Sequence, residues 1–158
     1  MRFKIRDIAR GGIIAALYIA VTMLFAPMSF GEVQLRVSEA LTLLPFYIPE
    51  AVPALFIGCL LANFTGGFGL WDVVFGSGAT LLAAWLSSKM PNLWLAALPP
   101  VIVNMFVIGA MLHFIIDVPL IAAYLYVGLG QAAACFVVGI PLMKVLEKCS
   151  ILKYRDER

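Results

Sequence analysis

The sequence predicts an all-α integral membrane protein, a single domain over residues 1–158 that forms a bundle of about six transmembrane helices. Hydrophobic residues make up 63% of the chain and charged residues only 13%, which is more apolar surface than one soluble core can bury. Apolar runs follow one another along the chain, separated by glycine, proline or charged residues. Because one span needs about 20 apolar residues, a chain of 158 residues has room for about six helices and for no separate soluble domain.

The first three helices are predicted from apolar runs that end at proline or glycine. The first run covers residues 8–27, and its full spanning length indicates a retained helix and not the short apolar core of a signal peptide. The second helix covers residues 38–47 and is short for a span, because prolines punctuate its end. The third covers residues 51–64 and ends at the glycine-rich turn TGGFG, where the chain can reverse.

The last three helices follow after this turn. The fourth covers residues 71–86, with an acidic residue near its N-terminus as the helix dipole favours. The fifth covers residues 93–114 and is expected to be interrupted at Pro99 and Pro100. The sixth covers residues 120–146.

Basic residues gather at one end of this predicted bundle. With an even number of crossings, both termini share one side of the membrane with the connections near Glu50 and Lys89. Ten of the eleven Lys and Arg residues then lie on that side: Arg2, Lys4, Arg6, Arg10, Lys89, Lys144, Lys148, Lys153, Arg155 and Arg158. The positive-inside rule makes that side cytoplasmic, so we expect a multi-pass protein of the cell membrane with both termini in the cytoplasm.

The connection between the first two helices carries polar residues in an otherwise apolar chain. In FGEVQLRVSEALTLLPF, residues 30–46, the polar residues Glu32, Gln34, Arg36 and Ser38 alternate with Val33, Leu35 and Val37. This period of two predicts a partly extended outer loop, with one face toward water or a ligand and the apolar face anchored in the bundle. The alternative is a helical cluster in which Arg36 pairs with Glu32 and Glu39 and no ligand is bound.

A second polar group on the outer side lies in FTGGFGLWD, residues 64–72. Its glycines allow the backbone to approach a ligand closely, Phe68 and Trp71 offer flat faces, and Asp72 offers a carboxylate. The alternative is a tight turn with an interfacial tryptophan anchor. We favour a ligand site if these side chains face residues 32–39.

Polar side chains inside the predicted spans are few. Asn63 and Asn104 lie toward the outer ends of their helices, where they could line a pocket with Glu39 and Asp72. The common alternative role for such groups is to hold helices together. His113 and its neighbour Asp117 are too few for a metal site and are expected to make a loop interaction.

Small residues form stripes on two helices. Gly12, Ala16 and Ala20 recur every four residues on the first helix, and Gly128, Gly130, Ala132 and Ala134 crowd the sixth. A buried stripe packs helices within the bundle, whereas an exposed one would be a docking surface for a partner.

Several function classes lack their motifs in this sequence. There is no phosphate-binding GxxxxGK[ST] loop and no HExxH motif, and the three cysteines have no metal-ligand spacing. The chain is also too small for the inverted-repeat halves of most secondary transporters. We therefore expect no enzyme activity, no metal and no cofactor, and any solute movement would be driven from elsewhere.

The chain resembles the substrate-binding S-components of energy-coupling factor (ECF) transporters, and among them the QueT family, which is assigned to queuosine-precursor uptake. The stripe on the first helix is generic to S-components. The segment FGEVQLRVSEALTLLPF and the block GCLLANFTGGFGLWDVVFGSGATLLAA, residues 58–84, point to the QueT family.

This resemblance implies a solute site near the outer face, under the loop between the first two helices. The solute would be a 7-deazaguanine, such as the aminomethyl or cyano precursor of queuosine, or queuine. A module of a transmembrane T-subunit and two ATPase subunits would drive release inside, with Gly12, Ala16 and Ala20 meeting the T-subunit. The implied partners are thus the solute, this module and the lipid bilayer, without nucleic acid.

The polar residues suit such a solute, which presents two parallel N–H donors beside a ring carbonyl. A carboxylate from Glu39 or Asp72 could accept the donors, Asn63, Asn104, Gln34 or Arg36 could donate to the carbonyl, Trp71 or Phe68 could stack on the ring, and Glu32 could meet an aminomethyl cation. The alternatives are an S-component for another small vitamin or nucleobase, and a small membrane enzyme or scaffold subunit whose outer acids are structural.

Overall fold

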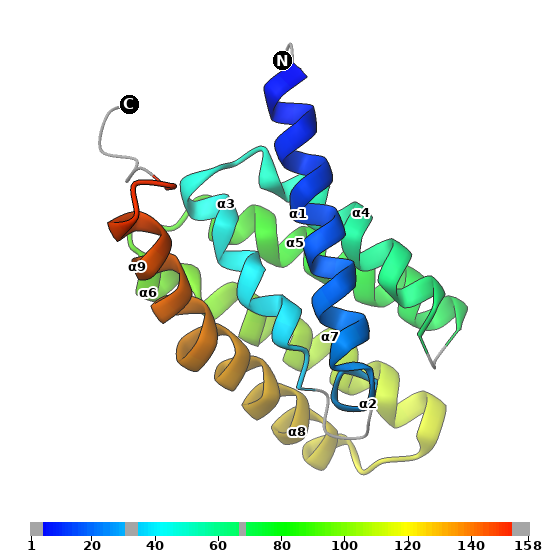
Figure 1. The fold of residues 1–158 in the computed structure, drawn as a ribbon. Coiled ribbons are helices and arrows are strands. Elements are labelled where there is room, and N and C mark those ends of the chain that lie inside the picture. The colour runs from blue at the N-terminus through cyan, green and yellow to red at the C-terminus, as the bar shows by residue number, and fades with distance from the viewer. Residues whose placement is uncertain (1–4, 31–34, 67–68, 153–158) are drawn as a thin grey trace.

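The computed structural model describes residues 5–30, 35–66 and 69–152. Every regular element within these ranges is helical, which confirms the all-α prediction. The helices lie side by side in one bundle, and the start of α1 (Ile5–Leu24) lies at the same end as α9 (Ile140–Lys148), as Figure 1 shows.

The predicted second helix, residues 38–47, is present as two consecutive short helices. A short helix α2 (Ala26–Ser29) follows α1, and the chain then enters the 3-10 helix η1 (Val37–Leu43) and α3 (Leu44–Tyr47). A proline in the first turn of α3 is tolerated because the first N–H groups of a helix have no partner in the helix.

The middle of the chain follows the predicted bounds closely. The third predicted helix is α4 (Ala51–Phe64). The fourth begins as a short π-helix, η2 (Asp72–Gly76), and continues as α5 (Ser77–Ser87). Helices α1 and α4 pack along each other, and a Cβ added at Gly58 would lie 3.0 Å from the carbonyl oxygen of Ala15. Glycine at this position allows the two helices to approach.

The last two predicted helices are present, and the fifth is interrupted at its prolines as predicted. A single turn α6 (Leu93–Ala96) precedes α7 (Leu98–Ile116), and Pro99 and Pro100 lie in the first turn of α7. The break at Ala97 between α6 and α7 lies directly before these prolines, which begin the long helix. After α8 (Leu120–Ala132) the helix continues through the π-helix η3 (Ala133–Gly139) into α9.

Length and composition make several helices able to cross a membrane. Among the described residues, three qualify as full spans: Ile5–Leu24, Leu93–Ile116 and Leu120–Lys148. Two shorter apolar helices are Ala51–Phe64 and Asp72–Ser87. These helices indicate a multi-pass membrane protein, and the count of six crossings stays a prediction.

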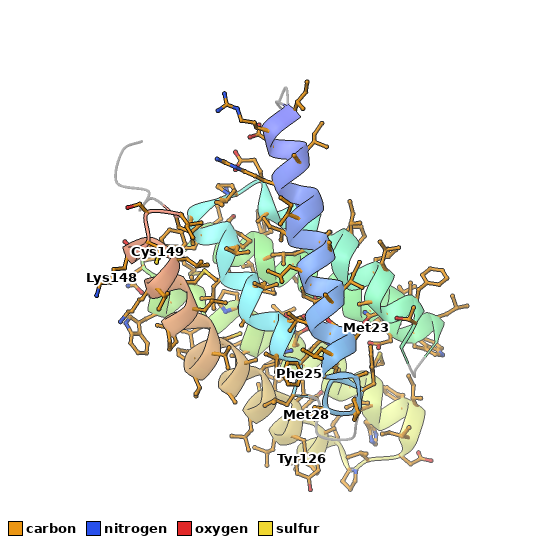
Figure 2. The ribbon with its side chains drawn as sticks, viewed as in Figure 1. Met23, Phe25, Met28, Tyr126, Lys148 and Cys149 are labelled. Atoms are coloured by element: carbon orange, nitrogen blue, oxygen red, sulfur yellow. The ribbon has the colours of Figure 1, made fainter. Side chains whose placement is uncertain are left out.

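Apolar side chains point outward along the bundle, and polar side chains gather inside it. Figure 2 shows Phe25 and Met28 near one end and Lys148 and Cys149 near the other, and both Phe25 and Met28 are exposed. By contrast, the buried polar residues include Arg36, Glu39 and other charged or amide side chains. This distribution is the one expected when lipid replaces water around the bundle.

The two small-residue stripes differ in their surroundings. Gly12, Ala16 and Ala20 of α1 are exposed, and a Cβ added at Gly12 would meet nothing within 4 Å. In α8, Gly128 is buried, and an added Cβ would lie 3.0 Å from the sulfur of Met105 in α7. The second stripe therefore packs helices within the bundle, and the first is open to an outside partner.

The loop between the first two predicted helices departs from its predicted form. Glu32 and Gln34 lie outside the described residues, the backbone is extended at Arg36, and η1 begins at Val37. Arg36 and Ser38 are buried, so the water-facing alternative for the polar side is wrong. Leu35 and Val37 on the apolar side are half-buried. A ligand-facing role for the polar side stays a prediction.

Candidate functional site

Glu39 is the centre of a buried polar network. The hydroxyl of Tyr18 in α1 and the hydroxyl of Thr80 in α5 both donate to its Oε1, the latter at 3.1 Å. Asn104 Nδ2 in α7 donates to its Oε2 at 3.4 Å. Because Glu39 is only 1% exposed, these three donors replace the water that a carboxylate would otherwise need. The Glu39 carboxylate thus joins η1 to three surrounding helices.

Neighbouring contacts hold η1 in this central position. Thr22 Oγ1 lies 2.6 Å from Ser38 Oγ and donates to the backbone carbonyl of Tyr18 at 2.8 Å. On the other side, a Cβ added at Gly139 would lie 3.2 Å from the carbonyl oxygen of Ala40, so η3 approaches η1 closely. The 3-10 helix is therefore fixed between α1 and η3.

Arg36 and Asp72 form a buried ion pair beside this centre. Arg36 NH2 lies 3.4 Å from Asp72 Oδ2, and their side chains are 6% and 0% exposed. The guanidinium carbon also lies 5.3 Å from the centre of the Phe30 ring, in a cation–π arrangement. In the helical alternative Arg36 pairs with Glu32 and Glu39; in the structure it pairs with Asp72 and not with Glu39, and Glu32 lies outside the described residues.

The π-helix η2 places Asp72 toward the network. Asn63 Nδ2 in α4 donates to the backbone carbonyl of Asp72 at 2.8 Å. One turn later, a Cβ added at Gly76 would lie 2.7 Å from Asn63 Nδ2 and 2.8 Å from Asp72 Oδ1. These distances are too short for a real side chain, so glycine at position 76 is what allows Asn63 and Asp72 to lie together. π-Helices are rare, and short π-helical segments next to α-helices frequently occur at functional sites.

Cys59 connects the two halves of the network. Its sulfur lies 3.4 Å from Asn63 Nδ2, 3.7 Å from Arg36 NH1 and 3.3 Å from Thr80 Oγ1. A hydroxyl has one proton, so Thr80 donates either to the Glu39 carboxylate or to this sulfur, and the carboxylate is the stronger acceptor. The two acids therefore belong to one continuous set of contacts.

Four buried polar atoms have no hydrogen-bond partner among the described residues: Asn63 Oδ1, Asp72 Oδ1, Ser77 Oγ and Gln131 Oε1. Two of them belong to the network, and both are acceptors. A ligand that carries N–H donors could bind these two acceptors. Within the described residues, the His, Cys, Asp and Glu side chains form no group of three or more that could hold a metal ion.

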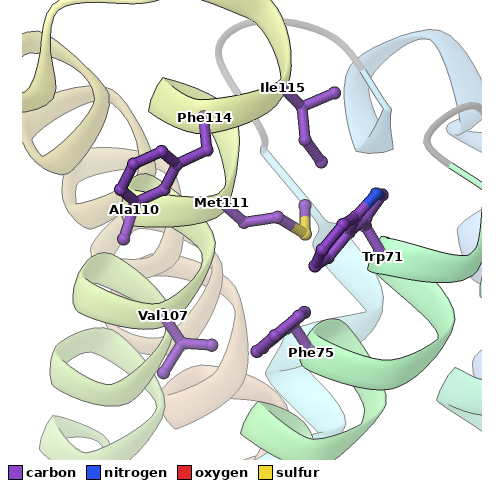
Figure 3. Close-up of a pocket in the computed structure, with 7 residues that line it drawn as sticks. All are labelled: Trp71, Phe75, Val107, Ala110, Met111, Phe114 and Ile115. Atoms are coloured by element: carbon purple, nitrogen blue, oxygen red, sulfur yellow. The ribbon is translucent and has the colours of Figure 1, made fainter.

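An apolar cavity of about 790 Å³ lies on the other side of the π-helix η2. It is lined by Trp71, Phe75, Val107, Ala110, Met111, Phe114 and Ile115 (Figure 3). The Trp71 and Phe75 rings stack with their centres 5.6 Å apart and are 14° from parallel. Sequence reasoning missed this cavity, although the spacing of four between Val107, Met111 and Ile115 was a signal for one apolar helix face.

The structure brings together five of the predicted binding residues: Arg36, Glu39, Asn63, Asp72 and Asn104. Trp71 is not part of this group, because it is 58% exposed and lines the apolar cavity. The other three predicted residues, Glu32, Gln34 and Phe68, lie outside the described residues.

Sequence reasoning did not assign Tyr18, Cys59 or Thr80 to the site. For Tyr18 there was a signal, since Ile14, Tyr18 and Thr22 recur every four residues and form the buried face of α1. The predicted loop interaction of His113 is confirmed: its Nδ1 lies 2.8 Å from the backbone carbonyl of Val118.

Comparison with known proteins gives two matches. The model of a family described as "QueT transporter" matches residues 8–148. A protein of Lactococcus lactis subsp. cremoris named queuosine precursor transporter QueT is 30% identical over 150 residues, which cover 85% of this chain and 88% of that protein. No solved structure matches the chain.

Proposed function

Because this chain belongs to the QueT transporter family, we propose that it is the substrate-binding S-component of an ECF importer whose solute is a queuosine precursor. The family is one of transporters, and the chain is not an enzyme. The solute would be a 7-deazaguanine: the aminomethyl precursor, the cyano precursor or queuine. It would bind from the outer face before ATP-driven release into the cell.

The observation that carries this proposal is the buried network of Arg36, Glu39, Asn63, Asp72 and Asn104. Charged side chains inside a membrane bundle are costly, and they commonly mark a substrate pathway. Carboxylates accept adjacent N–H donors, and amide or guanidinium groups donate to a ring carbonyl. This combination suits the polar edge of a deazaguanine.

The energy for uptake would come from other subunits. The chain has no phosphate-binding ATPase loop, and we assign ATP hydrolysis to two separate ATPase subunits that act through a transmembrane T-subunit. The exposed stripe of Gly12, Ala16 and Ala20 supports this arrangement, because small exposed residues let a second helix approach closely.

The orientation follows from the basic residues. Lys148 lies at the end of the bundle opposite to Phe25 and Met28 (Figure 2), and the predicted census puts most Lys and Arg residues at the same end as Lys148. Both termini would then be cytoplasmic in the cell membrane, and the connection that precedes η1 would face outward.

A second candidate is an S-component for another small vitamin or nucleobase. The same network favours it, since any planar heterocycle with paired donors and a carbonyl could use the same acids and amides. The two candidates differ in the solute and agree on the architecture and on the energy source.

Isothermal titration of the detergent-purified chain tests the solute. The aminomethyl and cyano deazaguanines are titrated in turn, with guanine and riboflavin as controls. We expect tight binding of the deazaguanines alone. Preferential binding of guanine or riboflavin would replace the proposed solute with the second candidate, and binding of none would remove the substrate assignment.

Co-purification with the ATPase subunits tests the partner. Gly12 in α1 and Gly78 in α5 are both exposed helical glycines with nothing within 4 Å of an added Cβ, so they form a matched pair. Gly12→Leu should abolish recovery of the co-expressed T- and ATPase subunits, while Gly78→Leu should leave it unchanged. Equal recovery with both variants would argue against the stripe as the contact surface.

A further inference from the structure

Two unpartnered acceptors lie in the buried network, on two side chains that meet at Gly76. Asp72 Oδ1 and Asn63 Oδ1 have no hydrogen-bond partner among the described residues, and both side chains are 0% exposed. Leaving such atoms without donors in an apolar interior is unfavourable, and more so for a carboxylate. An N–H or O–H donor that enters the bundle, from water or from a ligand, would satisfy them.

The direction of the Asn63 amide is fixed by its neighbours. Its Nδ2 donates to the backbone carbonyl of Asp72 at 2.8 Å, and a flipped amide would bring two acceptor oxygens together. Nδ2 therefore keeps this contact, and Oδ1 stays available to a donor. The other carboxylate oxygen of Asp72 is occupied by Arg36 at 3.4 Å.

Glu39 differs from Asp72 in this respect. Both of its carboxylate oxygens have donors: Oε1 from Tyr18 and Thr80, and Oε2 from Asn104. The protein itself thus supplies hydrogen bonds to both oxygens of Glu39, whereas it supplies them to only one oxygen of Asp72. The two acids are equally buried, but only Asp72 offers an open acceptor.

Gly76 leaves room for the two side chains that carry these acceptors. A Cβ at this position would lie 2.8 Å from Asp72 Oδ1 and 2.7 Å from Asn63 Nδ2, so a side chain there would have to displace both groups. Gly78, two residues later, has nothing within 4 Å of an added Cβ. Of these two glycines, only Gly76 has no room for a side chain.

We infer that Asp72 Oδ1 and Asn63 Oδ1 form the subsite for two adjacent N–H donors of the ligand. Gly76 contributes by leaving room for both side chains. The chemical class is a planar heterocycle in which a ring N–H stands beside an exocyclic amino group. The inference rests on the proposed function, because a deazaguanine carries this edge. Glu39 then acts as a positioning residue that holds η1 and the surrounding helices.

The test compares two ligands on matched variants of the full, detergent-purified chain. The ligands are the cyano deazaguanine and its analogue without the 2-amino group, both measured by isothermal titration. The parent should bind the analogue on the order of 10- to 100-fold more weakly, as expected when a hydrogen bond to a charged acceptor is lost. In Asp72→Asn, the amide oxygen can stay with Arg36 and an N–H₂ group then faces the ligand, so this discrimination should disappear.

Glu39→Gln is the matched control for Asp72→Asn, because each variant replaces a buried acid with its amide. Because Glu39 holds the network together, this variant should weaken the binding of both ligands alike and keep the parent's ratio between the two affinities. Retained discrimination in Asp72→Asn, or its loss in Glu39→Gln, would overturn the inference and leave the proposed solute intact. Failure of the parent to bind any deazaguanine would instead overturn the proposed solute, and the inference with it.

A second pair of variants decides the matter if Asp72→Asn does not fold. Gly76→Ala should weaken binding of the cyano deazaguanine by at least about 10-fold, because the new methyl group displaces the Asp72 carboxylate and the Asn63 amide. Gly78→Ala should bind as the parent does. Thermal unfolding in the same detergent verifies that both variants are folded, and equal affinities of the two folded variants would overturn the inference.

Discussion

The polar network and the apolar cavity lie on opposite sides of the π-helix η2 and differ in the contacts that form them. In η2 and the residue before it, Asp72 and Gly76 face the network, while Trp71 and Phe75 line the cavity. The network consists of directional contacts that join distant parts of the chain. The cavity is bounded by apolar surfaces without such contacts. A side chain lost from the network should therefore cost more free energy of unfolding than one lost from the cavity.

The largest effect is expected for Glu39→Ala, which removes the acceptor of Tyr18 and Asn104 and leaves Thr80 only the weaker sulfur acceptor of Cys59. The free energy of unfolding, measured by denaturant titration in mixed detergent micelles, should fall by about 4 kcal/mol. Glu50→Ala is the control, because Glu50 precedes α4 without a side-chain cap hydrogen bond. Similar values for the two variants would show that the network does not stabilise the bundle.

A smaller effect is expected for Thr80→Val, which keeps the shape of the side chain and removes one donor from Glu39. The free energy of unfolding should fall by about 1 kcal/mol. In the control Thr65→Val, the lost hydroxyl contact is to Ala62 at an exposed position, where water can replace it. If the Thr65 variant lost as much stability as the Thr80 variant, burial would not be the reason for the effect.

The smallest effect is expected for Trp71→Ala in the apolar cavity. Loss of its stacking on Phe75 should cost about 1 kcal/mol or less, and the affinity for the cyano deazaguanine should not change. The sequence alone made Trp71 a candidate to stack on the ligand ring. A marked loss of affinity, measured by titration, would restore that interpretation and weaken the separation between network and cavity.

The helices were largely predictable because each depends on local features of the chain. The range 51–64 was predicted as it stands in α4, since an apolar run that ends at a glycine-rich turn defines both ends. The polarity of Arg36, Glu39, Asn63, Asp72 and Asn104 also singled them out, because such residues are costly in lipid. The exposed stripe on α1 and the packed stripe on α8 could be distinguished only with neighbouring helices in place.

The sequence by itself determined that apolar helices form a membrane bundle and that a few polar residues must lie inside it, because lipid cannot solvate them. Only the tertiary structure decided which of these residues meet. Arg36 pairs with Asp72, 36 positions away, and not with nearby Glu39, whose donors come from α1, α5 and α7. Such pairings depend on how the helices pack against one another, and the spacing of residues along one segment does not specify it.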